Sequence, residues 1–214
     1  MSSYCGSNVM YSFLVQGAMS VPVDHHEQDA ENSSRKIVAG LFISLDGVVD
    51  SLEASPKKWG SNEMNETIAA GVAQADTVML GPRTYKMLAQ FWQHQSDNLP
   101  MARFLNHSDK YLVSSTITED MLEWQPASLI KGKLFEEIMK LKQRPGKNIQ
   151  IPGSPRLVRS LLQNGLLDEL RLNICPVVIG SGMRLFDEIT NQVPLHLVDS
   201  KAYSNGVVGL TYRI

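Results

Sequence analysis

The chain has 214 residues, of which 43% are hydrophobic and 20% charged, and its formal net charge at pH 7 is -2. This length and apolar content fit one large domain, or one domain with an extension, and allow a sizeable buried core. The near-neutral charge and the lack of a basic stripe exclude an electrostatic footprint for nucleic acid. No apolar stretch reaches the roughly 20 residues that a membrane-spanning helix needs, so we expect no membrane contact.

The first 35 residues differ from the rest of the chain. They hold one short apolar patch followed by a polar run, and no basic region precedes Tyr11, as a signal peptide would require. We expect a poorly ordered N-terminal extension over residues 1–35, followed by one domain over residues 36–214.

Strand and helix patterns alternate from residue 36 onward. Apolar and β-branched runs bounded by turn residues predict strands, and apolar residues at a spacing of three and four predict helices. Ser61 or Asn62 can cap the first helix, and Gly165 fits the end of the last one. The predicted strands cover residues 36–47, 76–80, 110–116, 148–151 and 167–179, with two more in 195–214, and the predicted helices cover 61–74, 83–92, 132–143 and 156–164.

Alternating strands and helices predict an α/β fold with a mixed, mostly parallel sheet flanked by helices. Asn205-Gly206, between two alternating apolar patterns, predicts a C-terminal antiparallel hairpin at one edge of the sheet. The segment 179–186, "IGSGMRLF", resembles a phosphate loop but lacks both the G-x-G-x-x-G and the Walker A pattern. We interpret it as a loop leading into a short helix that packs Leu185 and Phe186 into the core.

Four predicted strand ends carry glycines, hydroxyls and one arginine. Ligands of open α/β sheets bind outside the carboxyl ends of the strands. Hydroxyls and amides donate hydrogen bonds there, glycine permits close approach, and arginine adds a cation. Turns also use Gly, Ser and Pro for structural reasons, so each strand end taken alone is more typical of a structural turn. The four ends together favour a binding site for a phosphorylated ligand. The four ends are residues 44–47, 81–84, 114–116 and 152–155.

Asp46 and Glu63 are the acidic candidates near the first strand end. A carboxylate at a pocket mouth can hold an N–H donor ring or relay a proton. Asp46 fits a turn former equally well, and Glu63 fits the first turn of a helix, where its charge complements the helix dipole. Trp59 could line a pocket for a flat ring, although buried aromatic residues more often belong to the core.

The two cysteines and the histidines give no sign of a metal centre or of disulfide bonds. Cys5 and Cys175 lie far apart and outside any Cys-x-x-Cys motif, and the histidines at 94, 107 and 196 have no ligand spacing. A pair at 25 and 26 is more typical of a solvated tail than of a metal site. We therefore expect no metal and a protein of the reducing cytoplasm.

In order along the chain, these segments resemble the dihydrofolate-reductase-like superfamily. The closest branch is the one named for the reductase domain of the bifunctional riboflavin-biosynthesis deaminase–reductase. The resemblance covers residues 36–214 and is most specific over 151–186, where many positions match in one register. The matching stretches are "SLDGVVDS", "ADTVMLGPRTYKMLAQFW", "KYLVSST", "IPGSPRLVRSLLQNGLLDELRLNICPVVIGSGMRLF" and "VVGLTYRI".

This resemblance implies NADPH as cofactor and hydride reduction of a small substrate, a heterocycle of pteridine or pyrimidine type or a carbonyl compound. It implies that Asp46 is the catalytic or orienting carboxylate. From the residue types alone we place Glu63 and Trp59 on the substrate side. The implied cofactor residues are Gly81, Arg83 and Thr84 at the adenosine-side phosphates, Ser114 and Ser115 along the adenosine ribose and its phosphate, and Gly153 and Ser154 at the pyrophosphate.

The sequence departs from this family pattern at three prolines. Pro82 stands where the family often has arginine, and Arg83 follows one place later. Pro152 and Pro155 remove N–H donors in the turn expected at the pyrophosphate. We expect Arg83 to carry the preference for NADPH over NADH. The alternative is a nucleotide-binding or regulatory module of the same fold without turnover.

Two further expectations concern partners. The zinc pattern H-x-E…P-C-x-x-C of the deaminases is missing, which predicts a stand-alone reductase-like domain. The long apolar run 170–179, near an apolar hairpin, predicts a homodimer, because it offers more apolar edge than a monomer usually leaves open. Apart from a second copy and a small-molecule substrate, we expect no partner.

Overall fold

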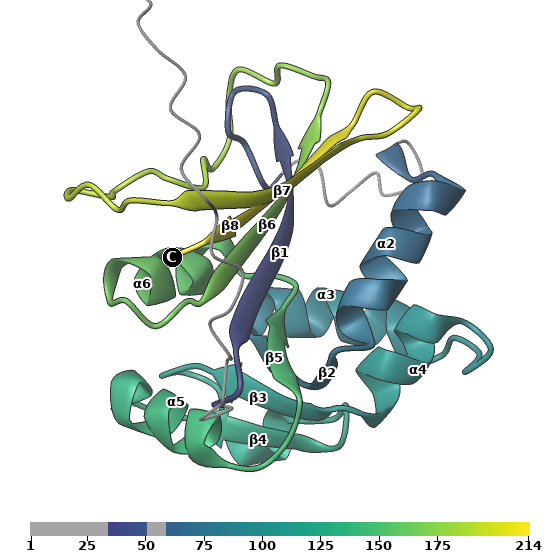
Figure 1. Ribbon diagram of the computed structural model, residues 1–214. Helices are drawn as coiled ribbons and strands as arrows, with labels where there is room; N and C mark the ends of the chain where they lie inside the picture. The colour runs from purple at the N-terminus through teal and green to yellow at the C-terminus, as the bar shows by residue number, and fades with distance from the viewer. Residues whose placement is uncertain (1–33, 51–58) are drawn as a thin grey trace, which may run out of the picture. The chain divides into compact units, whose positions relative to one another are not determined.

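The computed structural model describes residues 34–50 and 59–214 (Figure 1). Within them, eight strands form one sheet in the order β4-β3-β2-β5-β1-β6-β8-β7. The first six strands in the chain pair in parallel, whereas β8 pairs antiparallel with both β6 and β7. The predicted mixed, mostly parallel sheet with a C-terminal antiparallel hairpin is confirmed. Most of the predicted N-terminal extension, with Cys5 and the histidine pair at 25 and 26, lies outside the described residues.

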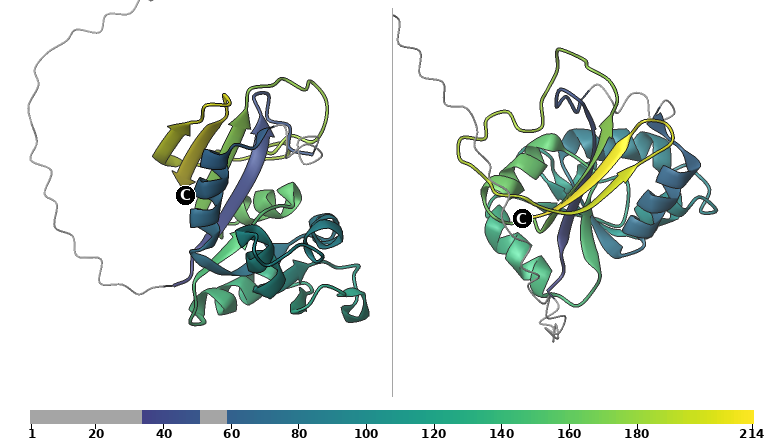
Figure 2. Two further views of the ribbon diagram at one scale, coloured as in Figure 1. Left: turned by 90° about the vertical axis from the view of Figure 1, so that its right-hand side faces the viewer. Right: turned by 45° about the horizontal axis from the view of Figure 1, so that its top comes forward.

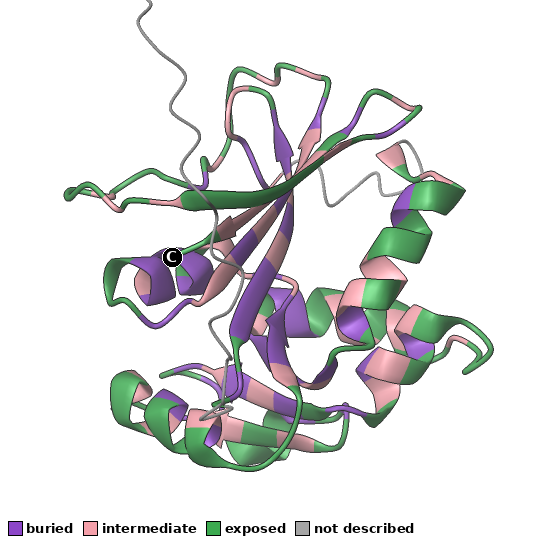
Figure 3. Cartoon of the chain, viewed as in Figure 1, coloured by how far each residue is buried: buried purple, intermediate pink, exposed green. Residues whose placement is uncertain are grey.

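The strands are short, and the central ones are the most buried (Figure 3). Strand β1 lies between β5 and β6, and Ile37 and Ala39 in it are fully buried. The strands are β1 (Ile37–Ser44), β2 (Ala75–Leu80), β3 (Asp109–Val113), β4 (Ala127–Ile130), β5 (Asn148–Ile151), β6 (Glu169–Cys175), β7 (His196–Ala202) and β8 (Val208–Arg213).

Helices cover both faces of the sheet. Side chains of α5 and α6 pack with one face of β1, β5 and β6 in the largest apolar cluster. Side chains of α3 and α4 pack on the opposite face, against β2 and β3, and α2 packs against the hairpin. Figure 2 shows the yellow β7–β8 hairpin beside β6, at the sheet edge away from the teal strands. The helices are α2 (Asn62–Val72), α3 (Pro82–Trp92), α4 (Pro100–His107), α5 (Leu134–Gln143) and α6 (Pro155–Gln163), and Glu119–Met121 form a 3-10 turn.

Local chemistry explains several element ends. The Ser61 hydroxyl accepts a hydrogen bond from the Met64 N–H at 3.2 Å and caps α2, as predicted. Gly165 follows α6 with φ of 63°, a left-handed conformation that favours glycine. Gly206 has φ of 84° in the hairpin turn, in agreement with the Asn-Gly prediction.

The structure corrects two predictions about elements and adds two elements that were not predicted. Strand β6 ends at Cys175, before Pro176, and does not continue to 179. Segment 179–186 forms a loop without the predicted helix: Leu185 is buried, as expected, but Phe186 is 42% exposed. Strand β4 and helix α4 were not predicted, because they have only four and eight residues and so few repeats of a periodic pattern. No helix within the described residues is long and apolar enough to cross a membrane.

Candidate functional site

The turns predicted to carry chemistry meet along one edge of the sheet. Strands β1 to β6 run parallel, so their carboxyl ends share this edge in the order β4, β3, β2, β5, β1, β6. All four predicted strand ends lie there, together with the ends of β4 and β6. The edge has three parts, which we call the junction, the groove and the clasp.

The junction is the close approach of the β2–α3 and β5–α6 turns at Gly81 and Ser154. A Cβ atom on Gly81 would lie 2.7 Å from the Cβ and 2.9 Å from the Oγ of Ser154, so only glycine fits without displacement. Helices α3 and α6 begin beside this contact, and no side chain caps either of them. Both have proline in the first helical position, where its missing N–H would have no helical partner in any case. The next N–H groups of both helices can therefore meet an anion.

The groove lies beside the junction, between the ends of β3 and β4, and has a volume of about 520 Å³. It combines three hydroxyl residues, one lysine and apolar walls. The Ser114 hydroxyl accepts hydrogen bonds from the N–H groups of Thr116 at 3.2 Å and Ile117 at 3.1 Å, which shapes the turn. The residues that line the groove are Pro82, Val113, Ser114, Ser115, Thr116, Ile130, Gly132, Lys133 and Leu134.

The predicted cofactor residues separate into three groups in the structure. Gly81, Gly153 and Ser154 lie in the turns that form the junction, and Ser114 and Ser115 line the groove. Thr84 is buried in the first turn of α3. Arg83 is exposed and does not line the groove. Their binding roles stay predictions.

The clasp joins the loop after β1, residues 44–50, to the loop after β6, residues 177–185. Three backbone hydrogen bonds of 2.8 to 2.9 Å connect the two loops. They run from the Leu45 N–H to the Val177 carbonyl, from Val49 to Met183, and from Leu185 to Gly47. The loop after β6 is thus held by backbone pairing to the loop after β1.

Asp46 is the centre of the clasp. Its carboxylate accepts hydrogen bonds from the Ile179 N–H at 3.0 Å, the Gly180 N–H at 2.8 Å and the Ser44 hydroxyl at 2.7 Å. Together these bonds, the one from Ile179 first, lower the pKa of Asp46 from 3.8 to about 2. The Nε of Arg184 also donates to the Asp46 carbonyl at 3.0 Å. Asp46 is therefore ionised at neutral pH and does not hold a proton to give to a substrate.

The two residues predicted on the substrate side face the hairpin. Trp59 packs against the apolar cluster of α2, Cys175 and the hairpin, and Ile179 of the clasp packs against the same cluster. The Trp59 carbonyl accepts a hydrogen bond from Asn205 at 2.6 Å. The Glu63 carboxylate lies 3.0 Å from the Lys201 ammonium of β7. Trp59 thus shares a cluster with the clasp, whereas Glu63 is engaged by the edge strand.

Lys133 and Gly132 are groove residues that the sequence prediction missed. They follow β4, a strand that was itself not predicted, so the turn had no place on the expected sheet edge. The run Ile130-Lys131-Gly132-Lys133 was the available signal, because an apolar stretch ending in Lys and Gly before a helix is typical of a strand end.

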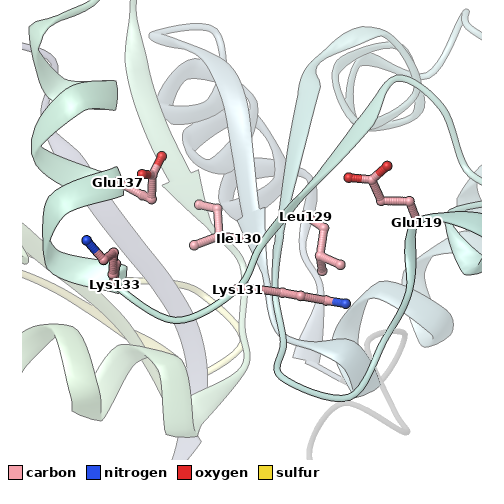
Figure 4. Close-up of a pocket in the computed structure, with 6 residues that line it drawn as sticks. All are labelled: Glu119, Leu129, Ile130, Lys131, Lys133 and Glu137. Atoms are coloured by element: carbon pink, nitrogen blue, oxygen red, sulfur yellow. The ribbon is translucent and has the colours of Figure 1, made fainter.

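A second hollow, of about 370 Å³, surrounds the edge strand β4 (Figure 4). Leu129, Lys131 and Glu119 lie on one side of the strand, and Ile130, Lys133 and Glu137 lie on the other. Residues two apart share a face of a regular strand, but Lys133 lies beyond the end of β4 and follows Gly132 with φ of 61°, so its side chain lies on the side opposite Lys131. This hollow carries charges of both signs, and Lys133 lines it as well as the groove.

A parallel sheet with such turns along its carboxyl edge defines an α/β domain of the class that binds ligands at that edge. Among the described residues, no group of three or more His, Cys, Asp or Glu side chains could hold a metal ion. The chain belongs to the RibD C-terminal domain family, whose family model matches residues 35–209. The resemblance inferred from the sequence is confirmed.

The chain is similar to proteins from several bacteria. The uncharacterized protein YyaP of Bacillus subtilis (strain 168) is 29% identical over 182 residues, which are 84% of this chain and 95% of YyaP. A putative riboflavin biosynthesis protein from Shewanella sp. PV-4 has a TM-score of 0.67 at 22% identity, covering 83% of this chain and 98% of that one. A dihydrofolate reductase from Enterococcus faecalis has a TM-score of 0.54 at 14% identity, covering 83% and 95%. The fold is thus dihydrofolate-reductase-like.

Proposed function

We propose that this protein is an NADPH-dependent reductase of a small heterocycle of pyrimidine or pteridine type, or of a small carbonyl compound. One observation carries the proposal: the junction lies between the groove and the clasp on one sheet edge, so a single dinucleotide could reach all three. The names of its similar proteins support it, because one is a putative riboflavin biosynthesis protein and another a dihydrofolate reductase complexed with NADP(H).

The residues of the edge fit such a cofactor by their chemistry. Uncapped N–H groups at the starts of α3 and α6 suit its phosphates, and the apolar, hydroxyl-bearing groove suits adenosine. When bound, NADPH supplies the hydride. In this proposal Asp46 orients the substrate by accepting an N–H and holds the clasp, and it does not supply the proton.

Two measurements test this function. Titration with NADPH, followed by nicotinamide fluorescence, should give saturable binding. Loss of absorbance at 340 nm with a panel of pyrimidines, pteridines and small carbonyl compounds should then identify a substrate. Binding without turnover on any compound would favour the alternative, a nucleotide-binding or regulatory module. The absence of binding to either NADPH or NADH would contradict both.

A further inference from the structure

We propose that Lys133 selects NADPH over NADH by binding the phosphate on the adenosine ribose, and that Glu136 weakens this selection by pairing with the same ammonium group. The inference rests on the proposed function and names the residues that would set its cofactor preference. It replaces the expectation that Arg83 reads this phosphate.

The order of the edge decides where a ribose phosphate would lie. The junction, at the ends of β2 and β5, lies between the groove, at β3 and β4, and the clasp, at β1 and β6. A dinucleotide with its bridging phosphates at the junction therefore extends one half to each side. The clasp presents the ionised carboxylate of Asp46, and the Arg184 guanidinium beside it is already held 3.7 Å from that carboxylate and donates to the Asp46 and Gly180 carbonyls at 3.0 and 3.2 Å. A phosphate monoester there would be repelled by the carboxylate and would have to compete with it for Arg184. The phosphate-bearing half consequently belongs in the groove.

Lys133 supplies the cation of the groove. It is the one charged residue among the described residues that line it, beside the hydroxyls of Ser114, Ser115 and Thr116. A phosphate dianion is bound most strongly by charge-assisted hydrogen bonds, and an ammonium with adjacent hydroxyl groups provides them. Arg83 is exposed on α3 and is not part of this lining.

The backbone at Lys133 gives an independent reason to assign it a role. Its φ is 37°, in the left-handed region, and it follows Gly132 with φ of 61°. Among the described residues, Glu188 is the only other non-glycine residue with positive φ. Glycine adopts this conformation without cost, whereas a residue with a side chain does not. A lysine kept in a strained conformation is typical of a functional position.

Glu136 competes for the same ammonium group. Its Oε2 lies 3.2 Å from the Nζ of Lys133, and the side chains of Lys133 and Glu136 are 73% and 53% exposed. An exposed pair of this kind is weak and readily exchanged. A bound phosphate would take the ammonium from Glu136, and the carboxylate left nearby would reduce the gain in affinity.

Calorimetric titrations with 2′,5′-ADP and with 5′-AMP test the assignment, because the two nucleotides differ only in the ribose phosphate. Lys133→Gln should lower the affinity ratio of 2′,5′-ADP to 5′-AMP about tenfold, and Lys133→Arg should keep most of it. Glu136→Gln should raise the ratio about two- to threefold. Lys140→Gln is the matched control: Lys140 lies on the same helix and pairs with Glu137 at 2.7 Å, and the ratio should not change.

Arg83→Gln separates the two candidate cations. A ratio that falls in Arg83→Gln and not in Lys133→Gln would overturn the proposal. An affinity ratio that Glu136→Gln leaves unchanged would also overturn the proposal. This second variant keeps the proposal testable if Lys133→Gln does not fold, which the melting curve of Lys133→Gln would reveal. A wild-type protein that binds both nucleotides equally would overturn this inference alone. A protein that binds neither of them, nor NADPH, would overturn the proposed function as well.

Discussion

At the scale of single residues, Asp46 has a structural role that its position after a strand in the sequence does not reveal. Its two carboxylate oxygens are already used by three donors, two of them backbone N–H groups of the other loop. The sequence left an even choice between a turn former and a functional carboxylate. The structural and the functional role are compatible in this geometry. A carboxylate that holds the clasp together also fixes the position of any group that the clasp presents to a substrate.

We predict that Asp46→Asn lowers turnover more than it lowers NADPH affinity. The amide keeps one acceptor oxygen but places an NH₂ group against the N–H of Ile179 or Gly180, which loosens the clasp. The groove and the junction come from other strand ends and stay intact. Steady-state kinetics and fluorescence titration measure the two effects. Equal losses in both would mean that the change disturbs the whole edge.

The same carboxylate predicts a pH dependence of stability. The pKa of Asp46 in the folded protein is lowered from 3.8 to about 2, so the ionised form stabilises the fold. This contribution is complete above pH 3.8 and disappears as the pH falls to about 2. Melting temperatures of the wild type and Asp46→Asn should therefore differ most near neutral pH and converge towards pH 2. A constant difference over this range would show that ionisation is not the cause.

At the scale of elements, the sequence predicted the long and periodic parts of the fold well. The capped helix at Ser61, the hairpin at Asn205-Gly206 and the parallel strands are confirmed. It failed where tertiary contacts decide. Gly180 and Gly182 have φ of 84° and 126°, and the Gly180 N–H is taken by Asp46, so the loop does not become the predicted helix.

The candidate site shows the same division. The turns were found because Gly, Ser and Pro mark strand ends in the sequence. The groove was not predicted, because one of its walls comes from β4, a strand of only four residues, and from Lys133, which follows that strand. Which arginine or lysine faces a groove depends on the turn conformation, and sequence spacing does not reveal it.

The contact between two elements at the junction predicts a compensating pair of substitutions. Gly81→Ala should destabilise the protein by about 1–3 kcal/mol, because the new Cβ would overlap Ser154. The double variant Gly81→Ala, Ser154→Gly should recover most of this loss, since the overlapping atoms are the Cβ and Oγ of Ser154. Urea unfolding of both variants and of Ser154→Gly alone measures the coupling. Strictly additive effects would show that the two turns do not constrain each other.

At the scale of the whole molecule, the start of the domain can be tested by truncation. The side chain of Arg35 is buried and donates to Asp76, to the Thr77 hydroxyl and to the Lys147 carbonyl. The expected extension 1–35 thus ends with a residue that the domain uses. We predict that a chain starting at Ser34 melts within a few degrees of full length, whereas a chain starting at Lys36 loses about 1–3 kcal/mol. Equal stabilities would mean that Arg35 contributes nothing.

The homodimer stays a prediction, but the exposed apolar edge that supports it belongs to a different strand from the one expected. Strand β6 lies inside the sheet between β1 and β8, so its apolar run is not an open edge. The edge strand nearest to β6 is β7, where Leu197 and Val198 are 48% and 50% exposed. Light scattering should give twice the monomer mass of 23.8 kDa, and Val198→Lys should shift it towards the monomer. A wild-type monomer at micromolar concentration would contradict this prediction.

The insertion of β5 between β1 and β2 has a consequence for synthesis on the ribosome. Both neighbours of β1 in the sheet, β5 and β6, lie more than half the chain further on. Strand β1 therefore cannot pair with either neighbour until Asn148–Ile151 has been made, while β2, β3 and β4 can already pair with one another. Its apolar side chains lack their partners in the sheet while residues 45–147 are made, a period in which an unpaired strand is prone to aggregate. The nascent chain is thus most in need of a chaperone at β1, a strand of which the finished protein buries six of eight residues.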